Sequence, residues 1–254
     1  WGPVIDGVSL ADAPEILIAR GDFNKVPVLL GSTRDEDAYA MVHSFTDLTE
    51  AQFDSMFKAR FPTLQVLLPE LKRIYAPGAY PYPADLGNYS QWWWTWMRIR
   101  TDVYEGVGPC SVRRIARALV RLGAPSVFVY HFAHPPQRNL TFRPGDDMPG
   151  TGKGNVLVPH SSEIPFVMFA LEMLSVEDGE TPLALAMNGF WAQFAAKGDP
   201  NMPNSEQPHW PRYTEEEDAI LRFEASPTGI QEQRGLRKHA CNFWDFPMAV
   251  VVGV

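Results

Sequence analysis

The chain has 254 residues, which is enough for one large domain or two small ones. Hydrophobic residues make up 45% of it and charged residues 20%, as in an ordinary globular protein, and the net charge is −8. This acidic balance argues against a nucleic-acid-binding protein, which presents a basic face, and against attraction to anionic lipids. The sequence has no run of about 18 apolar residues, so we expect no membrane-spanning helix.

The first half of the chain predicts one strand and several helices. The strand, 26–30, is short and apolar, and residues that break regular structure flank it. Thr49 and Gln52 form a capping-box pattern at the start of a predicted helix. The helices are expected at 12–20, 50–60, 65–75 and 91–104, with a loop over 76–90.

The second half continues the alternation of helices and strands. Helix 111–122 has the clearest pattern, because apolar residues recur every three or four positions while arginines occupy a solvated or salt-bridged face. Strand 126–132 is rich in β-branched and aromatic residues. We further expect helices at 163–174 and 181–197, a strand at 219–224, loops at 135–155 and 198–213, and a last helical turn within 234–247. Strands separated by helices predict an α/β sheet.

A carboxylate follows the first predicted strand. Sites in α/β sheets form at the carboxyl ends of strands, and Glu36 comes shortly after strand 26–30. A carboxylate there can orient an imidazole and stabilise the imidazolium that forms in acyl transfer. The alternative, which spacing alone favours, is a surface charge in an acidic turn. Asp35 and Glu36 do not suit a glycosidase, because adjacent side chains usually point apart and that chemistry needs opposed carboxylates about 5–9 Å apart.

A histidine in a distant loop is the candidate general base. His160 can accept a proton from a nucleophile and pass it to the leaving group. An acid followed later by a histidine fits the chain order nucleophile, acid, base of α/β-hydrolases. The alternative is an ordinary helix start, in which Ser161 or Ser162 is the cap and Glu163 a favourable first-turn charge.

Another histidine pair has the spacing of metal ligands. His131 and His134 are separated by two residues, but no third ligand matches them, so the metal signal is weak. We expect no metal and no cofactor.

Seven segments in chain order resemble the type-B carboxylesterase and cholinesterase family of α/β-hydrolases. Residues 26–36, VPVLLGSTRDE, are similar to the family's acid segment, and residues 160–167, HSSEIPFV, to its base segment. The resemblance implies that Glu36 is the triad acid, His160 the triad base and Glu163 a buried carboxylate behind them. The other similar segments are 1–7, 110–130, 187–201, 210–214 and 241–244.

The resemblance covers essentially the whole chain and implies its fold. Residues 1–254 are expected to be the C-terminal half of a single α/β-hydrolase domain, with a mixed, mostly parallel sheet flanked by helices. Asp37 stands where the family usually has glycine, a departure that leaves the acid in place.

The family's nucleophilic serine lies on a Gly-x-Ser-x-Gly elbow, and no such pentapeptide occurs in this sequence. We therefore expect the serine and the oxyanion hole on the N-terminal half of the same esterase, present as a separate chain. A truncated sequence is the alternative. A half-sheet alone would leave open strand edges and exposed apolar surface.

The cysteines and sequons bear on the cellular route. Asn88 and Asn139 each begin a glycosylation sequon, and with one even cysteine pair they favour a secreted protein. The family often pairs cysteines at the places of Cys110 and Cys241, so the resemblance implies one disulfide.

The activity implied is hydrolysis of a small ester. The rival is a non-catalytic adhesion or binding protein on the same fold; such proteins tend to lose triad residues, so Glu36 and His160 favour catalysis. A third possibility is an enzyme for a special ester such as a lipid, because the fold does not identify the substrate. Candidates for the lining of an ester pocket are Tyr39, Met41, Phe45 and Trp92–Trp96, with core packing favoured for any single tryptophan.

Overall fold

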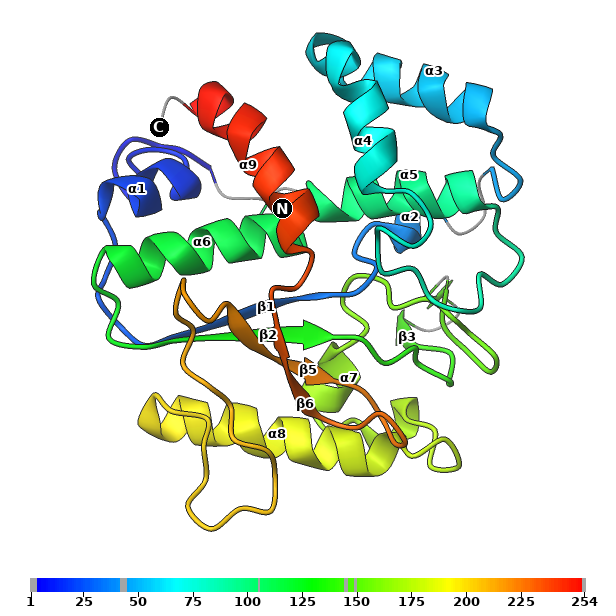
Figure 1. Cartoon of the computed structure of the whole chain (residues 1–254). Coiled ribbons are helices and arrows are strands. Elements are labelled where there is room, and N and C mark those ends of the chain that lie inside the picture. The colour runs from blue at the N-terminus through cyan, green and yellow to red at the C-terminus, as the bar shows by residue number, and fades with distance from the viewer. Residues whose placement is uncertain (1–3, 42–44, 105, 144–145, 149, 253–254) are drawn as a thin grey trace.

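The computed structural model describes residues 4–41, 45–104, 106–143, 146–148 and 150–252 (Figure 1). The first three residues of the similar segment 1–7 therefore lie outside the described residues. The helices are α1 Pro14–Arg20, α2 Ala38–Met41, α3 Glu50–Arg60, α4 Leu68–Ile74, α5 Gln91–Asp102, α6 Pro109–Arg121, α7 Ile164–Val167, α8 Glu180–Lys197 and α9 Lys238–Val252, with 3-10 segments η1 Pro62–Leu67 and η2 Leu171–Met173. The strands are β1 Val28–Thr33, β2 Val127–Phe132, β3 Thr141–Arg143, β4 Asp146–Asp147, β5 Ala219–Phe223 and β6 Gln231–Arg234.

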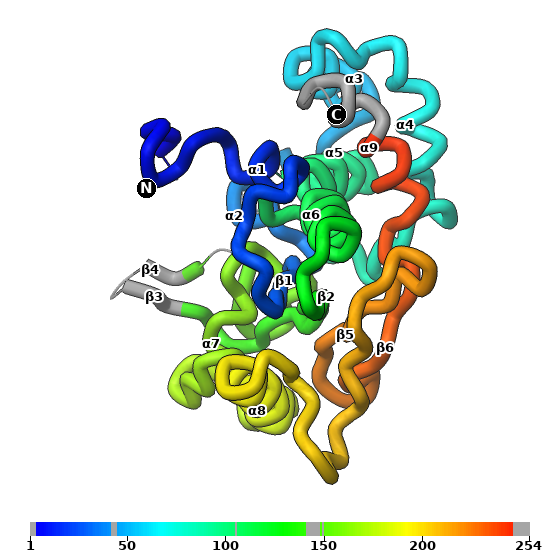
Figure 2. The backbone as a smooth tube through the Cα atoms, turned by 90° about the vertical axis from the view of Figure 1, so that its left-hand side faces the viewer, coloured from blue at the N-terminus to red at the C-terminus, as the bar shows by residue number. Residues whose placement is uncertain are grey.

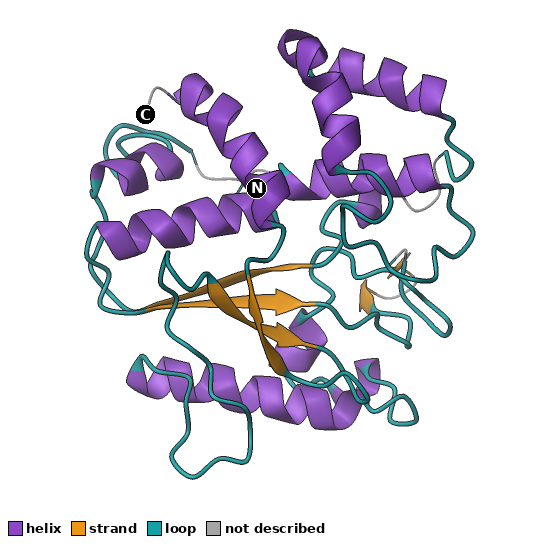
Figure 3. Cartoon of the chain, viewed as in Figure 1, coloured by secondary structure: helices purple, strands orange, loops and turns teal. Residues whose placement is uncertain are grey.

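The main sheet has the strand order β1-β2-β5-β6. β1, β2 and β5 run parallel, and β6 lies antiparallel on β5. The register places Val28 opposite Val127 and Tyr130 opposite Leu221. This mixed, mostly parallel sheet with helices on its faces is an α/β-hydrolase-type fold, which confirms the predicted fold class (Figure 3). Among the described strands β1 pairs only with β2, so its other edge has no strand partner there.

Alternating side chains of β2 build a core on each face of the sheet. Val127 and Val129 pack toward α6, whereas Phe128 and Phe132 pack toward α8. This period of two is what a strand buried on both faces requires. Figure 2 shows α6 and α8 on opposite sides of β1 and β2.

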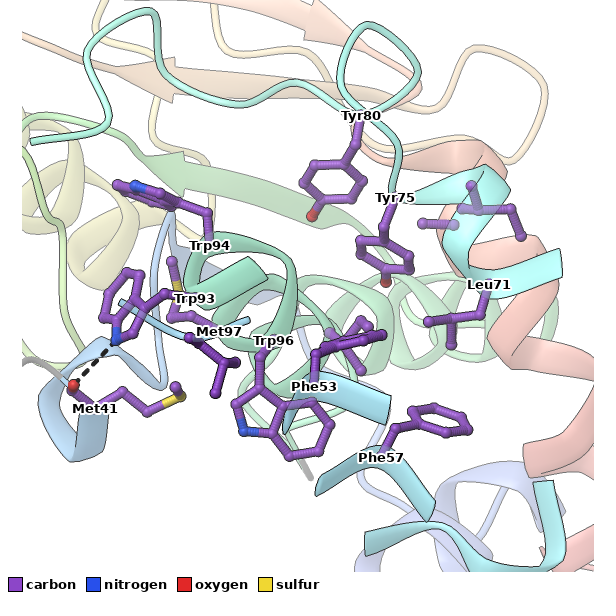
Figure 4. Close-up of a cluster of buried hydrophobic side chains, with 14 of the residues drawn as sticks. Met41, Phe53, Phe57, Leu71, Tyr75, Tyr80, Trp93, Trp94, Trp96 and Met97 are labelled. Carbon is purple, nitrogen blue, oxygen red and sulfur yellow. Dashed lines mark hydrogen bonds between the residues drawn. The ribbon is translucent and has the colours of Figure 1, made fainter. Parts of the chain in front are cut away.

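A third core is built mainly from aromatic side chains of α3 and α5. Trp93, Trp94 and Trp96 of α5 are buried in it (Figure 4). The indole Nε1–H of Trp93 donates to the carbonyl oxygen of Met41 at 3.2 Å. Trp93, Trp94 and Trp96 are thus core residues, the alternative that the sequence favoured.

A disulfide joins α6 to α9. It links Cys110 and Cys241, as the resemblance implies. The arginines of α6 form a salt-bridged face: Arg113 pairs with Asp218 at 2.9 Å, and Arg117 pairs with Glu215 at 3.0 Å. Among the described residues no helix is long and apolar enough to cross a membrane.

Several predicted boundaries are wrong for identifiable reasons. The predicted helix 65–75 is a 3-10 segment followed by the separate helix α4. Pro69, in the first turn of α4, has no backbone N–H to donate to the preceding turn, so one continuous α-helix does not form. The predicted helix 163–174 ends at Val167, and Phe169 has a left-handed φ of 54° that interrupts it. The terminal helical turn predicted within 234–247 is the longer helix α9.

Three short elements escape the sequence patterns. β3 and β4 form a two-stranded antiparallel pair within the predicted loop 135–155. β6 has the polar sequence QEQR and lies mostly exposed, so no apolar alternation marks it. α2 is a single turn that begins two residues after Glu36.

The disulfide closes a loop of 131 residues, and loop-closure entropy predicts a stabilisation of about 5 kcal/mol. We expect the native chain to titrate no thiols and the reduced, unfolded chain to titrate both. Replacing both cysteines by alanine should lower the unfolding midpoint in urea. Thiols that react before reduction would refute the pairing.

Candidate active site

The loop that carries Glu36, residues 34–37, joins the end of β1 to α2, and we call it the acid loop. Glu36 lies three residues beyond Thr33, and its side chain is 3% exposed. Its Oε1 accepts a hydrogen bond from the backbone N–H of Thr33 at 2.6 Å. The strand end therefore holds one carboxylate oxygen and leaves the other to face the base loop.

The loop before α7, residues 150–163, carries His160, and we call it the base loop. It brings His160 to this second oxygen of Glu36. Nδ1 of His160 lies 2.6 Å from Oε2 of Glu36, across 124 positions of sequence. A carboxylate only accepts, so Nδ1 carries the proton and Nε2 of the neutral ring holds the free electron pair. The imidazole is 49% exposed, and among the described residues no hydrogen bond occupies Nε2. The sequence candidates Glu36 and His160 thus form one acid–base pair.

A second carboxylate, Glu163, lies near enough to the pair for its charge to act on both members. Glu163 is half-buried, and its Oε1 accepts a hydrogen bond from the hydroxyl of Tyr130 at 3.3 Å. Tyr130 lies opposite Gly31 of β1, where any side chain would overlap the Tyr130 ring. A glycine at position 31 is therefore needed for the phenol to reach Glu163.

The charges around the pair shift two pKa values. The hydrogen bond that His160 donates to Glu36 raises the pKa of His160 above its ordinary value, and the charge of Glu163 acts in the same direction. Burial raises the pKa of Glu163, and the nearby charge of Glu36 adds to that rise. The site thus stabilises an imidazolium at His160.

The base loop contains a conformation that sequence reasoning missed. Ser161 has a left-handed φ of 70°, and this turn presents His160 to Glu36. Glu163 is the N-cap residue of α7 and makes no side-chain cap bond, so neither Ser161 nor Ser162 caps that helix. The interpretation of this segment as an ordinary serine-capped helix start is wrong.

Tyr104 is a further neighbour that no sequence pattern indicated. Its ring centroid lies 6.4 Å from that of His160. It also lines a cavity of about 370 Å³, together with Arg60, Phe61, Arg100 and Val103.

The other candidates lie apart from the pair. Tyr39 and Phe45 are exposed, and Met41 is buried in the aromatic core. His131 is a buried residue of β2, and Nε2 of His134 lies 3.0 Å from Glu180. No group of three potential metal ligands occurs within the part of the chain that the structure describes.

The two sequons lie on the surface. Asn88 is exposed in the loop before α5, and the hydroxyl of Ser90 in that sequon accepts from the N–H of Trp93 as the helix cap. Asn139 is also exposed, and its carboxamide packs close to Gly152.

The fold and this pair define an α/β-hydrolase-type protein that pairs a carboxylate beyond the end of β1 with a histidine from a distant loop. The chain belongs to the carboxylesterase family, whose model matches residues 1–244. It is 28% identical to the acetylcholinesterase of Bungarus fasciatus over 254 residues, which cover 96% of this chain and 38% of the relative. It is 29% identical to carboxylesterase 1D of Rattus norvegicus over 252 residues, which cover 95% of this chain and 40% of the relative. The chain thus spans about two fifths of the length of these relatives.

Replacing Ser161 by glycine should stabilise the chain by about 1 kcal/mol, because glycine adopts a left-handed φ without a side-chain clash. The control is Ser55, an exposed residue inside α3, where glycine should destabilise by about 0.5 kcal/mol. Urea midpoints of the two variants measure both effects. A Ser161→Gly variant that is less stable than the wild type would contradict the backbone strain that we infer at Ser161.

Proposed function

We propose that this chain supplies the acid and the base of a serine carboxylic-ester hydrolase. The observation that carries the proposal is the 2.6 Å hydrogen bond between a buried Glu36 and a half-exposed His160. Membership of the carboxylesterase family supports ester hydrolysis as the reaction class. A purely adhesive protein on this fold has no need of such a pair.

The serine of the triad would come from outside these 254 residues, which contain no Gly-x-Ser-x-Gly elbow. Its hydroxyl oxygen attacks the ester carbonyl carbon while Nε2 of His160 takes the hydroxyl proton. His160 returns that proton to the departing alcohol, and Glu36 stabilises the imidazolium meanwhile. In the second step, His160 takes a proton from a water molecule, whose oxygen attacks the carbonyl carbon of the acyl-serine. His160 then returns that proton to the serine oxygen, which frees the acid product. Backbone N–H groups of the serine-bearing segment would bind the oxyanion.

The sheet supports a companion segment. The outer edge of β1 has no partner among the described strands, and open parallel edges are normally covered. The relatives contain more sequence than this chain matches, and we propose that the N-terminal half of the same domain provides the serine as a separate chain.

The secretory route is also a proposal. It rests on the disulfide and on two exposed sequon asparagines, Asn88 and Asn139. A mass decrease after enzymatic removal of N-linked glycans would detect their use.

Fluorophosphonate labelling of the native material tests the function. Label on a second polypeptide that co-purifies with this 28.5 kDa chain is the expected result. His160→Ala should reduce ester turnover by at least about a thousandfold, because the serine loses its base. The control His209→Ala, an exposed histidine in another loop, should leave turnover unchanged. Absence of label, or turnover of His160→Ala within tenfold of wild type, would overturn the assignment.

The pH profile offers an independent check. Because His160 must be neutral to accept a proton, kcat/KM should rise with pH through the pKa of His160, which the hydrogen bond to Glu36 raises above its ordinary value. Glu36→Gln removes the charge that raises this pKa, so the rising limb should move to lower pH as the maximal rate falls. Initial rates from about pH 5 to about pH 9 measure both changes. A limb that stays in place would contradict the role of Glu36.

A further inference from the structure

Asp35 precedes the proposed acid, and its side chain points to different partners. It is fully buried, with 0% of the side chain exposed, and it does not contact His160. One oxygen, Oδ2, accepts from Nη2 of Arg34 at 2.9 Å and from the backbone N–H of Val158, also at 2.9 Å. Adjacent carboxylates of the acid loop therefore bind two different residues of the base loop, Val158 and His160.

The contact with Val158 is a two-point link between the acid loop and the base loop. Besides the side-chain bond, the backbone N–H of Asp35 donates to the carbonyl oxygen of Val158 at 3.0 Å. Asp35 is the neighbour of Glu36, and Val158 lies two residues before His160. The two hydrogen bonds thus hold the loops together close to the acid–base pair.

Arg98 of α5 anchors the carboxylate. Its side chain is 0% exposed and forms an ion pair with Oδ1 of Asp35. Arg98 also donates to the carbonyl oxygen of Arg34, so it binds the acid loop at a backbone and a side-chain oxygen. A buried ion pair gains little net stability, because both charges lose their hydration, so its main effect here is to fix geometry.

We propose that Asp35, anchored by Arg98, is a positioning residue that sets the spacing between Glu36 and His160. The role rests on the proposed esterase function, but the geometry it fixes exists without a serine. Loss of the link would let the base loop move away from Glu36, and a displacement of about 1 Å is enough to slow a reaction about 100-fold.

Asp37 provides a matched control in the same loop. It is buried to the same degree as Glu36 and pairs with Arg100 of α5, as Asp35 pairs with Arg98. Its backbone N–H donates to the hydroxyl of Thr101, also in α5. Asp37 thus has an arginine partner from the same helix, but its side chain and its N–H bind α5 and not the base loop.

The test compares Asp35→Asn with Asp37→Asn in the esterase as isolated. Asp35→Asn keeps an oxygen that can accept from Val158 but loses the charge that pairs with Arg98, so the link loses its anchor. The variant should lower kcat by about 30- to 100-fold and change KM by less than about threefold. Asp37→Asn should keep kcat within about threefold of wild type. Proton NMR gives a readout that needs no catalysis: the downfield signal of the His160 Nδ1–H should disappear in Asp35→Asn and persist in Asp37→Asn.

A second variant covers the case in which Asp35→Asn fails to fold. Asp35→Ala/Arg98→Met removes both charges together, so neither stays buried without its partner, and it also removes the acceptor for Val158. This folded double variant should show the same loss of kcat and of the NMR signal. A double variant with wild-type kcat and an intact signal would overturn the proposal. A wild-type protein without esterase activity but with the Asp35-dependent signal would refute the function and leave the positioning role standing.

Discussion

Two buried guanidinium groups converge on the carbonyl oxygen of Arg34, in the loop that follows β1. Arg98 reaches it from α5, and Nη2 of Arg237 reaches it at 2.5 Å from the turn before α9. Each arginine has a buried counterion, Asp35 for Arg98 and Asp102 for Arg237. Because a buried charge without a partner is costly, the acid loop has little freedom to move away from either helix. The position of Glu36 depends on this constraint.

The acid–base pair combines two opposite requirements on exposure. Glu36 is buried, so its charge acts on the imidazole without competition from water, while half of the His160 side chain remains exposed. Parallel strands supply the common edge at which such distant loops meet. Gly31 contributes from within the sheet, since only glycine leaves room for the Tyr130 ring that bonds Glu163.

The aromatic region above the sheet has a structural role in this arrangement. Trp92 and Trp96 of α5 pack against Phe53 of α3, and Figure 4 shows Trp96 beside Phe53. The same helix α5 carries the arginines that hold the acid loop. The disulfide ties α6 to α9, and both of its cysteines are buried in the same aromatic core. The stability of the core and the precision of the site therefore depend on the same helices.

The sequence by itself determined the α/β class, the strands 26–30 and 126–132 to within a few residues, and the capping box at Thr49. These are local properties, because short apolar runs and cap residues act within a few positions of the chain. The resemblance supplied the pairing of Glu36 with His160 and of Cys110 with Cys241, which no local pattern contains. Tertiary structure alone decided that Asp35 and Glu36 face different partners. Only the folded chain brings Val158 and Arg98 to the same carboxylate, and a linear sequence does not encode the direction of two adjacent side chains in a turn.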